Sequence, residues 1–256
     1  MPADAKNTLR IPGTLDDNEF GWRARLGLIT PSRGWTPEHE WPRLLPKGVS
    51  YMVTRIPLKA TTPEELERMG KHTFDAAGLL ASADIDVLCY GCTVETILQG
   101  FAYDRALETR LTEETGKPAR TMTGAVMQAL ESFKTKKLAL VTPYIDEINQ
   151  LELKFMKSIG LDVVYFKGLG IANTVDIARI APSAVLDLGE EALTKAKDAD
   201  ALFISCGNLR TIDAIPVLEE AFGRPVISSN QALVWSGLRL AGINDQIAGY
   251  GRLFCQ

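Results

Sequence analysis

A chain of 256 residues with 46% hydrophobic and 23% charged residues has the composition of a globular protein with a sizeable core. The formal net charge is −4 and the sequence offers no broad basic face, which argues against nucleic acid as the main partner. No apolar run approaches the ~20 residues that cross a bilayer, and the polar first segment lacks the apolar core of a signal peptide, so we expect a cytoplasmic protein that does not enter a membrane.

After an irregular arm over residues 1–20, the first half alternates apolar strands with amphipathic helices. A helix is predicted with Thr36 as its N-cap and Pro37 in the first helical position. The segment 86–90 is nearly continuously apolar, which is typical of a strand in a parallel sheet covered on both faces. The further predicted elements of this half are strands at 25–30 and 49–56 and helices at 62–83, 94–115 and 123–133.

The second half repeats this alternation. A long loop that contains Gly168, Gly170 and Asn173 interrupts it once. The predicted strands are 138–141, 161–166, 201–205 and 226–228, and the predicted helices are 145–159, 181–196, 212–221 and 230–241. Strands that alternate with helices predict parallel sheets, in which ligands bind beyond the carboxyl ends of the strands. The loops expected at those ends are 30–34, 91–95, 142–146 and 206–211.

An internal repeat relates the two halves. Asp86 precedes Cys92 by six residues, as Asp200 precedes Cys206, and the dipeptide Thr30-Pro31 recurs as Thr142-Pro143. Repeats that keep the same order indicate two homologous units. We therefore predict an α/β protein with two Rossmann-like parallel-sheet halves, residues 1–133 and 134–256, related by pseudo-twofold symmetry with the active site between them. In that arrangement Cys92 and Cys206 converge on one cleft.

Four cysteines in a chain of this length do not indicate a disulfide scaffold. The pair Cys89 and Cys92 has a spacing that also serves zinc, but a structural zinc needs about two further ligands. The chain has only two histidines, His39 and His72, and they stand in unrelated contexts. We predict no metal site, and we interpret Cys89 as a small buried residue.

The motifs Gly91-Cys92-Thr93, Thr142-Pro143-Tyr144 and the stretch 205–211 carry a family likeness. With them the chain resembles the aspartate/glutamate racemase superfamily over residues 22–254, and within it the branch of maleate cis-trans isomerases, arylmalonate decarboxylases and ectoine-utilisation racemase-like proteins. The resemblance implies an enzyme without metal or organic cofactor, acting on a small carboxylate. Because family members often pair with themselves, a homodimer or higher homo-oligomer is also expected.

Carried over residue by residue, the resemblance implies that Cys92 and Cys206 are the catalytic acid/base or nucleophile pair. It further implies a set of residues that bind the substrate carboxylates. These are Arg33, Thr93, Tyr144, Asn173, Gly207 and Asn208. The chain departs from arylmalonate decarboxylases, which keep only the second cysteine and have a serine where this chain has Val94. It also departs from maleate isomerases, which usually have an asparagine in the loop 32–34.

The residues themselves support this chemistry. Each of the two cysteines lies in a loop shortly before a predicted helix, whose unpaired N–H groups and dipole favour an anion such as a thiolate. The main chain at Gly207 comes close enough to hold a carboxylate oxygen. Arg33 suits a second carboxylate through paired hydrogen bonds and favours a dicarboxylate. Simpler readings are an exposed charge for Arg33, a packed aromatic for Tyr144 and a turn residue for Asn173.

The sequence therefore predicts a cofactor-independent two-cysteine isomerase of a small carboxylic or dicarboxylic acid, like maleate cis-trans isomerase, acting by thiolate attack or proton transfer. The first alternative is an amino-acid or hydantoin racemase that uses two thiols as bases. The second is an enzyme like arylmalonate decarboxylase. An alternative without catalysis is a two-lobed protein that binds a small molecule, for which thiol alkylation would have no consequence.

Overall fold

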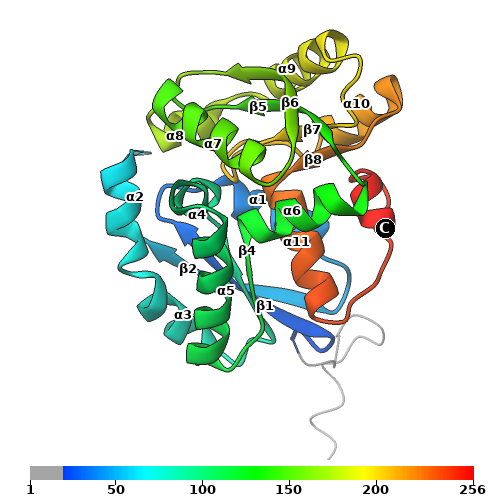
Figure 1. The fold of residues 1–256 in the computed structure, drawn as a ribbon. Helices are drawn as coiled ribbons and strands as arrows, with labels where there is room; N and C mark the ends of the chain where they lie inside the picture. The colour runs from blue at the N-terminus through cyan, green and yellow to red at the C-terminus, as the bar shows by residue number, and fades with distance from the viewer. Residues whose placement is uncertain (1–19, 61) are drawn as a thin grey trace, which may run out of the picture.

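A computed structural model describes residues 20–60 and 62–256, so nearly all of the predicted N-terminal arm lies outside the described residues. These ranges form two four-stranded parallel sheets with strand orders β2-β1-β3-β4 and β6-β5-β7-β8. The two orders are equivalent when the first four strands are matched in turn to the second four. Figure 1 shows the two sheets in separate layers, with helices on their faces. The predicted α/β class with two similar parallel-sheet halves is confirmed.

The first sheet consists of β1 (Ala24–Pro31), β2 (Val49–Ile56), β3 (Val87–Tyr90) and β4 (Ala119–Thr121). β1 is central, and its Leu26 is paired with Tyr51 on one side and Val87 on the other. Every residue of β3 is buried, which explains its continuous apolar sequence. β4 was not predicted from the sequence, because it has only three residues, directly after the turn that ends at Pro118.

The second sheet consists of β5 (Lys137–Thr142), β6 (Asp162–Gly168), β7 (Ala201–Ile204) and β8 (Val226–Ser228). β5 takes the central place that β1 has in the first sheet, and its Leu138 is paired with Val163 and Ala201. All four strands lie within two residues of the predicted ends.

Among the described residues, two predicted helices are each divided into two, and the short helices at Thr174–Arg179 and Arg252–Cys255 were not predicted. The segment 62–83 breaks between α2 (Pro63–Gly70) and α3 (Thr73–Ala81), and Gly100, with φ of +87°, separates α4 (Thr93–Gln99) from α5 (Phe101–Thr115). The predicted loop around Asn173 contains α8 (Thr174–Arg179). The other helices are α1 (Thr36–Leu44), α6 (Met122–Ser132), α7 (Asp146–Ser158), α9 (Pro182–Lys195), α10 (Ala214–Phe222), α11 (Ser229–Leu240) and the short 3-10 helix η2 (Arg252–Cys255).

Helix α11 joins the two halves. It belongs to the second half in sequence, yet it packs against α6, α1 and β3 of the first half, and Figure 1 shows α6 and α11 side by side. Cys89 of β3 is completely buried, as predicted, and it faces Gly237 of α11. Cys89 is therefore a core residue. The division into separate units at residues 133 and 134 stays a prediction.

Gly237 should not tolerate even a methyl group. A Cβ atom at this position would lie 2.9 Å from Cys89 Sγ, so we expect Gly237→Ala to lower the free energy of unfolding by about 1–3 kcal/mol through overpacking. Gly78 in α3 has nothing within 4 Å of its Cβ position, so Gly78→Ala should raise stability by about 0.5–1 kcal/mol. Urea unfolding of both variants, with Gly237→Ala repeated in a Cys89→Ala background, checks this. A loss that persists in that background would contradict the contact.

Candidate active site

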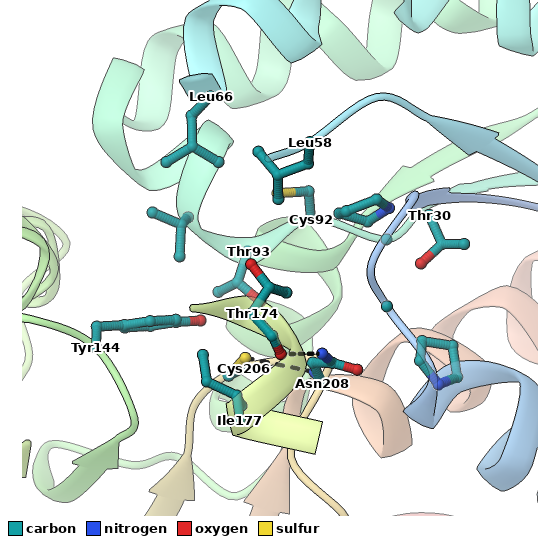
Figure 2. A pocket seen from close by; sticks show the side chains of 16 residues that line it. Thr30, Leu58, Leu66, Cys92, Thr93, Tyr144, Thr174, Ile177, Cys206 and Asn208 are labelled. Carbon is teal, nitrogen blue, oxygen red and sulfur yellow. Dashed lines mark hydrogen bonds between the residues drawn. The ribbon is translucent and has the colours of Figure 1, made fainter. Parts of the chain in front are cut away.

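A cavity opens where the carboxyl ends of both sheets meet. The loops after β1, β3, β5 and β7 all contribute to it, which confirms the predicted location of the loops (Figure 2). Its lining consists of Thr30, Pro31, Gly34, Pro37, Leu58, Leu66, Gly91, Cys92, Thr93, Val94, Tyr144, Thr174, Ile177, Cys206, Gly207 and Asn208. Within residues 20–60 and 62–256, no charged side chain contributes to this lining. A charged ligand here would be held by hydroxyl, thiol and main-chain groups.

Cys92 stands at the N-terminus of α4, in extended backbone conformation, and only 7% of it is exposed. Burial, together with the nearby carboxyl of Glu95 and the second thiol of Cys206, raises the pKa of Cys92 to about 12. The main-chain N–H groups of Glu95 and Val94 act in the opposite direction. The helix terminus therefore favours the thiolate as predicted, but the cost of removing the charge from water is the larger effect.

Cys206 faces the same cavity from the loop after β7. The prediction that it lies just before a helix is wrong, because α10 begins only at Ala214, and the donors to its sulfur come from the loop itself and from Tyr144. Its Sγ accepts a hydrogen bond from the N–H of Asn208 at 3.4 Å, and its own N–H donates to Ser229 Oγ at 3.0 Å. Burial raises its pKa to about 11, while the Asn208 N–H and the Tyr144 hydroxyl lower it. Its φ of +101° is rare for a residue with a side chain and is typical of a backbone held under strain at a functional site.

Tyr144 and Thr93 bring hydroxyl groups to the cavity that the two cysteines line. Tyr144 is 2% exposed, and Figure 2 shows its ring lying along one end of the cavity with the hydroxyl directed inward. Burial and the nearby thiol of Cys206 raise the pKa of Tyr144 well above its usual range, so it is a hydrogen-bond donor at neutral pH. Thr93 Oγ1 lies 2.9 Å from Met122 Sδ and 3.3 Å from Ser229 Oγ.

The Asn208 side chain is engaged by the protein itself. Its Oδ1 accepts hydrogen bonds from the N–H groups of Trp35 and Thr36 at 2.8 and 3.2 Å. Its Nδ2 donates to the carbonyl oxygens of Thr174 at 2.7 Å and Arg33 at 3.3 Å. The main chain of Asn208 reaches the cavity, whereas its amide group ties the Cys206 loop to segments on the opposite side.

Arg33 and Asn173 lie beyond the lining. Arg33 Nη1 donates to Asn173 Oδ1 at 3.3 Å in an exposed position, and Asn173 also caps α8 by accepting from the N–H of Val175. The structure thus brings six of the eight predicted site residues to one cavity, while these two contact each other outside it. Their role in binding a carboxylate stays a prediction.

Sequence reasoning missed two groups of residues. One is an apolar wall of the cavity that includes Leu58, Leu66 and Ile177. The other is a buried polar pair behind the Cys206 loop, Glu40 and Asn230, each 1% exposed. A signal for Glu40 existed, because it lies three residues after Pro37 on the buried face of α1 and a carboxylate in an apolar stripe is unusual.

The described residues hold no group of three or more His, Cys, Asp or Glu side chains placed to bind a metal ion. Over the same ranges, no helix has the length and apolar character needed to span a membrane.

A family model for arylmalonate decarboxylase matches residues 26–254. The chain belongs to the arylmalonate decarboxylase family. Arylmalonate decarboxylase of Bordetella bronchiseptica is 33% identical, over 90% of this chain and 95% of its own length. A maleate isomerase of Pseudomonas putida is 28% identical, over 90% of this chain and 96% of its own length. The expected resemblance to this branch is confirmed.

Solved structures from the same branch are also similar to this chain. A cysteine variant of the maleate isomerase Iso from Pseudomonas putida S16, solved with maleate, matches with a TM-score of 0.86 at 27% identity, covering 90% of this chain and 97% of that one. A Nocardia farcinica maleate cis-trans isomerase, with one cysteine replaced by serine, carries a covalently bound succinylcysteine intermediate. It matches with a TM-score of 0.84 at 25% identity, covering 90% and 98% of the two chains.

Proposed function

We propose that this member of the family is a cofactor-independent isomerase of a small carboxylic or dicarboxylic acid, similar to maleate cis-trans isomerases. The observation that carries the proposal is the pair of thiols, Cys92 and Cys206, which line one cavity from equivalent loops of the two halves. The maleate isomerase relatives support it, and one of them carries a succinyl group on a cysteine. The cytoplasmic location and a homodimer or higher oligomer stay predictions.

The reaction needs one thiolate and one thiol. We place this thiolate on Cys206, because the N–H of Asn208 and the hydroxyl of Tyr144 both face its sulfur and lower its pKa. A second thiolate in the same small space would be repelled by the first. Cys92 therefore keeps its proton until the substrate binds, and the two sulfurs can exchange roles within one turnover.

A cis-trans isomerisation proceeds by addition and elimination. One thiolate adds to an alkene carbon, and the pair of electrons from the double bond moves onto the carboxylate attached to the other carbon. The remaining single bond rotates, the electrons return, and the carbon–sulfur bond breaks to release the trans acid and the thiolate. The hydroxyl groups of Thr93 and Tyr144 and the main chain at Gly207 are placed to donate to the oxygen on which charge develops.

The apolar wall favours decarboxylation as a second candidate. Leu58, Leu66 and Ile177 suit an apolar substituent, and the part of the chain that the structure describes places no cation in the cavity lining for a second carboxylate. A malonate with such a substituent would lose carbon dioxide, and the electrons of the broken bond would form an enediolate that takes a proton from a cysteine thiol. The arylmalonate decarboxylase relative at 33% identity supports this alternative.

Proton NMR separates the candidates in one series. We expect the vinyl signal of maleate to be replaced by that of fumarate, and prior alkylation of the cavity thiols to stop the conversion. Release of carbon dioxide from phenylmalonate without conversion of maleate would establish the second candidate instead. Exchange of the α-proton of an amino acid or hydantoin in heavy water, with maleate untouched, would indicate a racemase. Ligand binding that survives alkylation, with no turnover, would indicate a binding protein.

A further inference from the structure

The peptide group between Gly207 and Asn208 provides the N–H donor that faces the Cys206 sulfur. Its N–H, from Asn208, points at Sγ at 3.4 Å, and its carbonyl oxygen, from Gly207, accepts a hydrogen bond from Asn230 Nδ2 at 2.8 Å. No peptide bond among the described residues is cis, and in a trans peptide the N–H and C=O point in opposite directions. A donor that holds the carbonyl therefore also aims the N–H.

Asn230 divides its amide group between two acceptors. It lies in the first turn of α11 and is 1% exposed. Besides the Gly207 carbonyl, its Nδ2 donates to Glu40 Oε2 at 2.8 Å. Each of the two amide hydrogens thus has one acceptor, and the acceptor on Glu40 decides which way the amide group faces.

Glu40 reaches this position from α1, on the other side of the interface between the halves. Its Oε1 accepts from the N–H of Thr211 at 2.6 Å and of Ile212 at 3.2 Å, just beyond the Cys206 loop. All of these donors are neutral amides. Burial raises the pKa of Glu40 to about 7, and the hydrogen bonds from Asn230, Thr211 and Ile212 oppose that rise. Burying a carboxyl group costs free energy of desolvation, so a buried carboxyl group with no charged partner among these donors indicates a functional role.

We propose that Glu40 is a positioning residue for the Cys206 thiol: through Asn230 it fixes the Gly207–Asn208 peptide so that the Asn208 N–H stabilises the thiolate. The inference rests on the proposed function in one respect, namely that Cys206 is the sulfur that carries the charge. Glu40 is not among the residues that line the cavity, so it would act on the reaction through Asn230 and the loop.

Glu40→Gln tests this because it keeps the size and removes one acceptor. If the new amide nitrogen faces Asn230, two donors oppose each other. Asn230 must then turn its amide so that Oδ1 faces residue 40, and its Nδ2 no longer donates to the Gly207 carbonyl. If the amide is flipped, its nitrogen opposes the N–H groups of Thr211 and Ile212. In the first case the Gly207 carbonyl loses its donor, so the Asn208 N–H is no longer held on the sulfur. In the second case the segment just beyond the Cys206 loop loses the acceptor that holds it in place.

The readout is the alkylation rate of each thiol by iodoacetamide against pH, followed by mass spectrometry of the separate peptides on the full chain without substrate. We expect Cys206 in Glu40→Gln to react about tenfold more slowly at a fixed pH below its pKa, the size expected when one hydrogen bond to a charged group is lost. Cys92 should be unchanged within about twofold. The matched control is Glu38→Gln, which alters an exposed carboxylate of the same helix that pairs with Arg55.

A second variant keeps the test decisive if Glu40→Gln folds poorly. The double variant Glu40→Gln with Asn230→Asp restores a donor–acceptor pair between the two side chains but leaves the Gly207 carbonyl without a donor. We expect its urea midpoint to recover in part, since the Gly207 carbonyl stays without a donor, while the alkylation of Cys206 stays slow. Recovery of both, or an equal slowing of Cys92 and Cys206 in the single variant, would show a merely structural role and overturn the proposal. Since no substrate is used, a wild-type protein that fails to isomerise maleate leaves this result unaffected.

Discussion

Replacing either Cys92 or Cys206 by serine is expected to lower kcat for maleate isomerisation by about 10² to 10⁴-fold, the range for loss of a positioned acid, base or nucleophile. Serine nearly preserves the size of the side chain, but its hydroxyl ionises far less readily than a thiol. Because the two sulfurs are proposed to act on one molecule, the double variant should be little worse than the single ones. Proton NMR of fumarate formation gives these rates.

Cys255 provides the matched control for these variants. It is exposed, it lies near the C-terminus, and it is not one of the residues that line the cavity. Cys255→Ser should keep the wild-type kcat. A Cys92→Ser enzyme with wild-type kcat would mean that a single thiol is sufficient for isomerisation, which would contradict the two-thiol mechanism.

Asn208→Ala is expected to lower the free energy of unfolding by about 2–4 kcal/mol, which is large for the loss of one polar side chain. The variant leaves the N–H groups of Trp35 and Thr36 without their acceptor and the carbonyl oxygen of Thr174 without its donor. These groups lie between the two halves, where water does not easily replace the lost partner. Urea unfolding followed by circular dichroism measures the change.

Asn173→Ala serves as the comparison, since Asn173 also makes several hydrogen bonds but is exposed. Its replacement removes a helix cap, so we expect a loss of about 0.5–2 kcal/mol. If Asn208→Ala costs no more than Asn173→Ala, the amide of Asn208 does not tie the halves together and is free to serve the substrate.

Much of the fold was predictable because the two halves of the sequence are an internal repeat, so each half supports the prediction for the other. The stretches Asp86–Cys92 and Asp200–Cys206 each contain a fully buried strand, and a continuously apolar strand of this kind is typical of a parallel sheet covered on both faces. What the sequence did not reveal depends on single residues or short segments. Gly100 breaks a helix through a positive φ, and β4 has only three residues, too few for a pattern.

The candidate site was predictable only where chemistry and position coincide. Cys92 and Cys206 stand at strand ends and face one cavity, so their types and places both indicated a site. Asn208 has the right type and place, yet its amide is occupied by contacts with residues more than 170 positions earlier in the chain, as well as with Thr174. Such long-range hydrogen bonds leave no local pattern. The same holds for Glu40 and Asn230, which meet only after both halves have folded.

The central claim is that the sulfurs of Cys92 and Cys206 both reach one small acid. Its most direct test is mass spectrometry of the wild-type chain quenched during turnover of maleate, with the modified peptide identified. The account predicts an adduct with the mass of one maleic acid, since a thiol S–H has added across the double bond, located on Cys92 or Cys206. An adduct confined to exposed Cys255, or maleate converted with neither cavity cysteine ever modified or required, would contradict it.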